Sequence, residues 1–144
     1  MQLRFEIVPK QSIRNSWDVW RKYLSEISQK MKDSWTPEDF FPAFMGNTAF
    51  LFSITDETLH SFGITVVIIK IRQYTGEPYL EVFAANLDSW DEVTGPQMIA
   101  FYDDIAKKAG CSKIEFSSSR LGWLKKNTGC KVARVVYQRE VPNG

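Results

Sequence analysis

The chain has 144 residues, of which 44% are apolar and 14% aromatic, and its 18 basic and 17 acidic residues leave a net charge of +1. This composition is that of an ordinary globular protein, and one domain over residues 1–144 is expected. The near-zero charge argues against a nucleic-acid binder, and no stretch resembles a signal peptide or the roughly 20 apolar residues of a membrane span. We therefore expect a soluble protein with neither nucleic acid nor membrane as a partner.

The first third of the chain predicts one strand and two helices. Residues 2–9 alternate apolar and polar side chains, which is typical of a half-buried strand. Apolar residues then recur at intervals of three and four, which predicts a helix of about 20 residues capped by Ser12. The members of this stripe are Ile13, Trp17, Trp20, Leu24, Ile27 and Met31. Thr36 and Pro37 are typical of a second helix start, and that helix should end near Gly46.

The middle of the chain predicts an antiparallel meander followed by a helix. Its three strands are expected at residues 48–55, 63–74 and 79–86, because the segments between them are rich in turn-forming residues. The run VVIIKI in the second strand is typical of a strand covered on both faces. From 94 to 108 the apolar spacing becomes helical again.

The last part predicts a short strand at 112–118, a short helix at 119–129 and a final strand at 131–141. The segment from the third meander strand through the 94–108 helix to the next strand is a crossover, so these two strands should be parallel. The expected fold class is α/β, or α+β by convention, with a mixed sheet and helices on both faces.

The two cysteines, Cys111 and Cys130, stand alone, without a CxxC pair or clustered histidine. Both precede apolar runs, and we expect buried free thiols and no metal site.

This element order, with its two early helices, its meander and the closing segment TGCKVARVVYQREV, resembles the GNAT acyltransferase fold over nearly the whole chain. The resemblance implies a mostly antiparallel, twisted sheet of six or seven strands. It also implies that the strand before the central helix splays from its neighbour. In active members a Q/R-x-x-G-x-G/A loop at the start of that helix presents backbone N–H groups to the pyrophosphate of acetyl-CoA.

The corresponding stretch here, NLDSWDEVTGPQM, departs from that pattern. With Gly95 on the last small residue of the family loop, Val93 replaces the middle glycine and Trp90 replaces the Arg or Gln. Three acidic side chains would repel a phosphate: Asp88, Asp91 and Glu92. We therefore expect no cofactor, with acetyl-CoA held at Thr94 and Gly95 as the alternative.

The resemblance also implies catalytic positions, and this chain matches them in part. Lys125 stands where family enzymes often carry a tyrosine that protonates the leaving thiolate. Glu81 lies on the last meander strand, where a general base is often found. His60 is a second candidate base because of the intrinsic pKa of histidine. The favoured interpretation has no catalytic residue; if the protein is an enzyme, Glu81 and His60 are the candidates.

A narrower likeness is carried by Arg120-Leu121-Gly122-Trp123, which resembles the R-x-G-W ending of GNAT-like proteins encoded beside structural genes of tailed bacteriophages. It implies a non-catalytic virion-associated or other interaction component, located in the virion or host cytoplasm, whose partners are other subunits of a phage particle. The expected interface residues are Arg120, Trp123, Arg134, Gln138 and Arg139. The alternatives are a divergent acyl-CoA-dependent N-acyltransferase and a small regulatory or inhibitory protein that binds a host factor.

Overall fold

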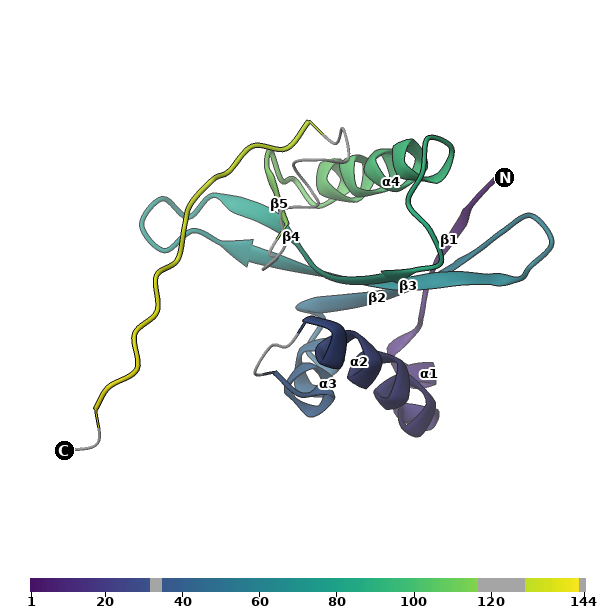
Figure 1. Ribbon diagram of the computed structural model, residues 1–144, viewed down its shortest axis with the longest axis horizontal. Helices are drawn as coiled ribbons and strands as arrows, with labels where there is room; N and C mark the ends of the chain where they lie inside the picture. Colours follow the sequence, from purple (N-terminus) through teal and green to yellow (C-terminus); the bar gives the residue numbers. More distant parts are fainter. Residues whose placement is uncertain (32–34, 117–128, 143–144) are drawn as a thin grey trace.

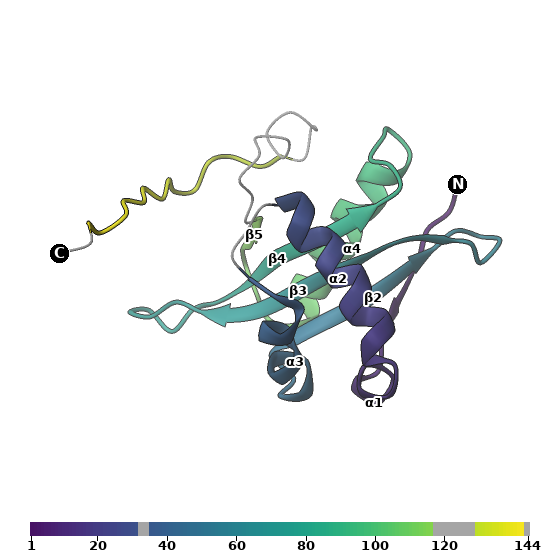
Figure 2. The ribbon, with the colours of Figure 1, turned by 60° about the horizontal axis from the view of Figure 1, so that its bottom comes forward.

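The computed structural model of the chain describes residues 1–31, 35–116 and 129–142. The elements in chain order are β1 (Arg4–Ile7), α1 (Lys10–Asn15), α2 (Trp17–Met31), α3 (Pro37–Met45), β2 (Ala49–Thr55), β3 (Ser61–Ile71), β4 (Pro78–Leu87), α4 (Thr94–Lys108) and β5 (Ile114–Phe116). The strands form one sheet in the order β1-β2-β3-β4-β5, antiparallel except for the parallel pair β4–β5. Helices α1 to α3 cover one face of this sheet and α4 covers the other (Figure 1, Figure 2).

The predicted fold class is confirmed: the sheet is mixed and mostly antiparallel, and helices lie on both faces. The described residues hold five strands, fewer than the six or seven predicted. The meander is formed by β2, β3 and β4, and the crossover through α4 makes β5 parallel to β4 as expected.

Strand β3 runs through the centre of the sheet and is buried on both faces. Val66 and Val67 are 1% and 0% exposed, although their side chains point to opposite faces. Val66 belongs to the cluster under α1 to α3, and Val67 to the cluster under α4. The apolar run VVIIKI therefore supplies both halves of the core.

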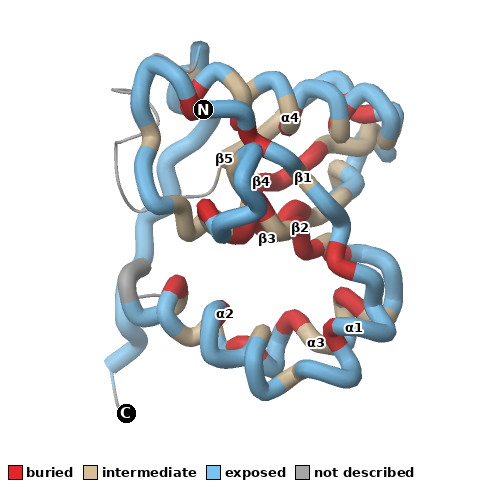
Figure 3. The backbone as a smooth tube through the Cα atoms, turned by 90° about the vertical axis from the view of Figure 1, so that its right-hand side faces the viewer, coloured by how far each residue is buried: buried red, intermediate tan, exposed pale blue. Residues whose placement is uncertain are grey.

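The first helical layer packs through the predicted apolar stripe, but the single predicted helix is two helices. The chain leaves helical geometry at Ser16, which separates α1 from α2 with φ −120° and ψ 33°. Helix α1 begins at Lys10, directly after Pro9, so Ser12 is not a cap. Ile13, Leu24 and Ile27 are buried, and Trp17 and Trp20 pack against the same cluster. In Figure 3 the buried positions of this layer face the sheet.

Helix α3 begins as its sequence predicts. The Asp39 carboxylate accepts a hydrogen bond of 2.7 Å from the Thr36 N–H, and Pro37 occupies the first turn, where no N–H is needed. Among the helices that the structure describes, none is long and apolar enough to cross a bilayer.

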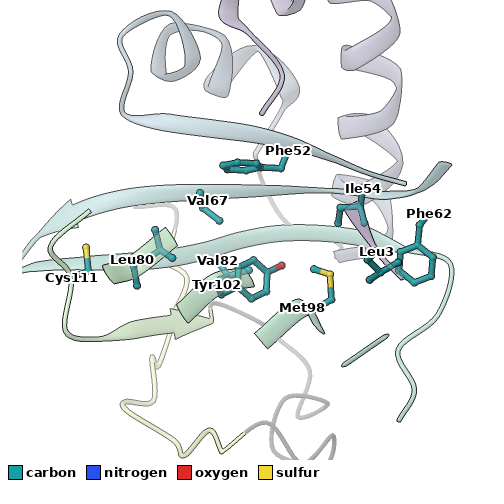
Figure 4. Packing of buried hydrophobic residues seen from close by; sticks show 11 residues of the cluster. Leu3, Phe52, Ile54, Phe62, Val67, Leu80, Val82, Met98, Tyr102 and Cys111 are labelled. Carbon is teal, nitrogen blue, oxygen red and sulfur yellow. The ribbon is translucent and has the colours of Figure 1, made fainter. Parts of the chain in front are cut away.

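The opposite layer is built around Tyr102 of α4, which is 0% exposed (Figure 4). Thr65 donates a hydrogen bond of 2.9 Å to the Ala84 carbonyl, so the Tyr102 hydroxyl, 2.8 Å from Thr65 Oγ1, is the donor to that oxygen. Burial raises the pKa of Tyr102 well above its usual range. A neutral phenol with a satisfied hydroxyl can remain in an apolar core at little cost.

A β-bulge in β4 shifts the alternation of its side chains between the two faces of the sheet. It lies next to Ala84, whose carbonyl accepts the Thr65 hydrogen bond. The pairing with β3 passes from Val66–Ala84 to Val67–Val82, so Phe83 is an extra residue in β4. As a result both Phe83 and Ala84 contact the cluster under α1 to α3, although they are consecutive. The ring of Phe83 lies 4.6 Å from that of Phe40 and 5.3 Å from that of Trp35, centroid to centroid.

The predicted final strand at 131–141 is wrong, because residues 129–142 form no strand. Alternating apolar residues favour a strand only where a neighbouring edge supplies hydrogen-bond partners. Here the segment extends away from the sheet (Figure 1). Its exposed apolar residues are Val132, Val135, Val136, Tyr137 and Val141. The predicted helix at 119–129 lies outside the described residues apart from Gly129.

Replacing Gly63 with alanine should destabilise the fold. A Cβ at this position would lie 2.1 Å from the Asn86 carbonyl oxygen, so β3 and β4 would have to separate. We expect Gly63→Ala to lower the free energy of unfolding by about 1 to 3 kcal/mol, measured by urea denaturation. The control Ser61→Ala, at an exposed position of β3, should change it by less than about 0.5 kcal/mol. An unchanged midpoint for Gly63→Ala would contradict the close approach of the two strands.

Candidate functional site

Glu81 is a buried carboxylate on the first half of β4. Only 3% of its surface is exposed, and it is the one buried charged residue in the described part of the chain. It lies opposite Ile68 of β3, so its side chain points to the face covered by α1 to α3. Lys70 Nζ lies 3.0 Å from its Oε1, and 44% of the Lys70 side chain is exposed. The ion pair therefore extends from the interior to the surface.

A second carboxylate stands beside it. Glu115 of β5 is the register partner of Glu81, so the two side chains share a face of the sheet. Arg72 forms an ion pair with one oxygen of Glu115 and Arg134 with the other. The Arg72 guanidinium also lies 4.5 Å above the ring of Tyr79.

The two arginines control the ionisation of Glu115. Burial opposes its negative charge, but the hydrogen bonds from Arg72 and Arg134 outweigh this effect and hold the pKa of Glu115 below its usual value. Glu115 is thus a fixed anion held from both sides. Glu81 pairs instead with Lys70, whose side chain reaches solvent.

The start of α4 is closed by its own loop. Asp91 Oδ1 accepts hydrogen bonds from the N–H groups of Val93 and Thr94, at 2.8 and 2.9 Å. The Gly95 N–H donates to the Asp91 carbonyl at 2.9 Å. These backbone bonds hold the pKa of the Asp91 carboxyl below its usual value. Asp91 therefore occupies the place that an anion would take at the helix N-terminus.

Trp90 covers the glycine that matches the family loop. A Cβ on Gly95 would lie 2.6 Å from Trp90 Nε1, so the missing side chain makes room for the indole. Thr94, the other candidate for holding acetyl-CoA, is 1% exposed, and its hydroxyl lies 3.2 Å from Asp91 Oδ1. The helix start does not fit a diphosphate, because its N–H donors already bind Asp91 and the Trp90 indole covers Gly95.

His60 lies apart from Glu81. It sits in the turn between β2 and β3 with 82% of its side chain exposed, and Nδ1 is 2.8 Å from Thr58 Oγ1. The register pairs Gly63 with Leu87 and Ile68 with Glu81, so His60 is beyond the far end of the β3–β4 ladder from Glu81. The structure does not bring the two candidate bases together.

A separate groove lies between β1 and α4. Phe5 and Phe101 stack at its floor with ring centroids 4.2 Å apart, and Ile7, which is 54% exposed, lines its rim. Its ionisable groups, Asp104 and Lys108, form an exposed i,i+4 ion pair. The titratable side chains that line this groove are exposed, and the buried carboxylate Glu81 lies on the opposite face of the sheet.

Several predicted positions remain untested. Arg120, Trp123 and Lys125 lie outside the described residues. Gln138 and Arg139 are exposed on the extended C-terminal segment, and their role as interface residues stays a prediction. Cys111 is buried and Cys130 half-buried, and both are free thiols.

Sequence reasoning missed the partners of Glu81 and Glu115. Lys70 and Arg72 lie two residues apart at the end of VVIIKIR, which places both on one face of a strand. This spacing of two basic residues could have predicted that acidic partners lie on the same face of the sheet. The pairing with β5 depends on the parallel register, which no local pattern specifies.

The solved structures most useful for comparison are acetyltransferases. A putative acetyl transferase from Pyrococcus furiosus matches with a TM-score of 0.68 and 13% identity over 97% of this chain and 100% of that one. A ribosomal-protein-alanine N-acetyltransferase from Brucella melitensis biovar Abortus 2308 matches with a TM-score of 0.67 and 11% identity, over 97% and 100%. An aminoglycoside N-acetyltransferase in complex with CoA gives a TM-score of 0.65 and 14% identity, over 96% and 95%. No family model and no curated protein sequence matches the chain.

These comparisons support the GNAT fold and correct the favoured functional interpretation. The prediction of a non-catalytic phage component is contradicted, because the similar structures are described as acetyltransferases. The inference rested on four residues, Arg120 to Trp123, and on the departures in the loop. Neither outweighs a fold likeness that extends over nearly the whole chain. The virion location and the phage partners have no support from them.

Removing the charge of Glu115 should weaken the fold above acidic pH. Its lowered pKa means that its contribution is present above the unfolded-state pKa of about 4.3 and is lost as pH falls through the folded-state value. Glu115→Gln should therefore reduce the free energy of unfolding by about 1 to 2 kcal/mol at pH 7 and flatten its decline below pH 5. Urea titrations at several pH values measure both. Equal pH profiles for the variant and the wild type would contradict the double ion pair.

Proposed function

We propose that the protein is an N-acyltransferase that moves an acyl group from a thioester to an amine. In this reaction the amine nitrogen forms a bond to the acyl carbon, the carbon–sulfur bond breaks, and a thiol and an amide are released. The proposal is supported by the likeness to acetyltransferases over 96% of the chain or more, one of which is a complex with CoA. The acyl thioester is a substrate of the reaction, and acetyl-CoA is its simplest form.

The observation that carries the proposal is the position of Glu81. The resemblance implies a general base on the last strand of the meander, and this strand holds a buried carboxylate there. Its role would be to take the proton that the amine loses as the new bond forms. The Lys70 ammonium lies 3.0 Å from the Glu81 carboxylate and would hold it in position.

An acetyl-transfer assay with Glu81→Gln tests this function. The amide keeps the shape of the side chain but accepts no proton, so kcat should fall by about 100-fold or more. The assay follows thiol release from acetyl-CoA and from S-acetyl-pantetheine. The acceptors are a peptide with N-terminal alanine and an aminoglycoside, the amines named for two of the similar proteins.

Glu26→Gln is the matched control, because Glu26 is exposed on α2 and its substitution should leave kcat unchanged. Circular dichroism establishes that Glu81→Gln is folded before its rate is compared. A folded Glu81→Gln protein with the wild-type kcat would exclude Glu81 as the base. If no amine is acylated from either donor, the proposed function is wrong.

A further inference from the structure

We infer that the acyl donor of this protein is recognised through its pantetheine thioester and that the nucleotide half of CoA contributes no binding. This inference rests on the proposed function and specifies the donor of the same site. It follows from the way in which the loop between β4 and α4 uses its own groups. The loop has the backbone N–H donors and the glycine that an anion site needs. The donors, however, already bind groups of the chain itself, and the glycine is covered by a side chain.

The backbone donors are the first of these features. An α-helix leaves the N–H groups of its first turn without intrahelical partners, and these are the groups that bind a phosphate. Here the Val93 and Thr94 N–H groups donate to the Asp91 carboxylate. The Gly95 N–H donates to the Asp91 carbonyl, and Pro96 has no N–H. Four consecutive residues thus offer no free donor.

Asp91 itself is held in this position. Its own N–H donates to Thr94 Oγ1 at 3.1 Å, so the acid and the threonine cap one another across the first turn. A diphosphate could take the Val93 and Thr94 donors only by displacing the Asp91 carboxylate. Because the carboxylate is attached to the chain and the phosphate is not, the displacement would cost both the cap and the entropy of association.

Shape and charge act in the same direction. The face of Gly95 that could let a ligand approach the backbone is covered by the Trp90 indole. Residues 86–98 include three acidic side chains and no basic one. A diphosphate at this place would therefore meet repulsion and no counter-charge.

The thioester half of the donor is not affected by these features. Pantetheine is uncharged, so the three acidic side chains of the loop do not repel it. The two halves of the donor would therefore be treated differently. The proposed function puts the acyl end near Glu81, whereas the helix start offers the nucleotide end no free backbone donor.

Calorimetry with two donors tests the inference on the whole chain. S-acetyl-pantetheine and acetyl-CoA should bind with dissociation constants within about threefold of each other. Binding of acetyl-CoA at least tenfold more tightly than S-acetyl-pantetheine would overturn the inference, because the nucleotide would then contribute. The same titrations are valid whether or not an amine is acylated, so the outcome is independent of the proposed function.

A second experiment repeats these titrations with a variant of Asp91. Asp91→Ala releases the Val93 and Thr94 donors and should tighten acetyl-CoA binding by at least tenfold, while binding of S-acetyl-pantetheine stays within threefold. Glu92→Ala removes the same charge from the same loop but leaves the Asp91 cap in place. It is expected to change acetyl-CoA binding by less than threefold.

Three results would contradict the role of Asp91. They are an unchanged acetyl-CoA affinity in Asp91→Ala, an equal gain in Glu92→Ala, and an equal gain for S-acetyl-pantetheine. A wild type that binds neither donor would overturn the inference as well, because the pantetheine thioester would then not be recognised. Circular dichroism checks that α4 is retained in each variant.

Discussion

The burial of β3 on both faces is the constraint on which the rest of the structure depends. A strand with apolar side chains on both sides cannot lie on a surface, so it requires a helical layer on each face. The two helical layers cover the strand with different kinds of side chain. Aromatic rings from α2 and α3 pack on one side, and on the other α4 inserts Tyr102, whose hydroxyl is satisfied by Thr65. Both layers position β4, the strand that carries Glu81.

The bulge at Phe83 links this packing to the site. Without the extra residue, strict alternation would place Val82 and Ala84 on the same face, and one of the two core clusters would lose a member. With it, Val82 packs under α4 and Ala84 under α1 to α3. The bulge lies two residues after Glu81. The packing of the two core clusters therefore also shapes the strand beside the candidate base.

The loop after β4 shows how a single carboxylate can occupy a helix start that would otherwise accept an anion. The strand, the turn and the helix start have the arrangement that binds an anion, yet a carboxylate of the chain fills it. The helix is stabilised in either case, because its dipole and its donors need an acceptor from some source. The acceptor is internal here, so stability of α4 does not depend on a ligand.

The sequence by itself determined the class of fold and most of its elements, because hydrophobic period is a local property. The range of α4 and the antiparallel meander followed from spacing and turn residues alone. Three features were decided only by the tertiary structure: the break at Ser16, the absence of a strand at 131–141, and the cluster of Glu81 with Glu115. The break at Ser16 interrupts an apolar stripe that continues through α1 and α2, so the spacing of apolar residues does not reveal it. The strand requires hydrogen bonds from a neighbouring edge, and the cluster requires the register of parallel strands. These two are relations between segments distant in the chain, which a local pattern does not contain.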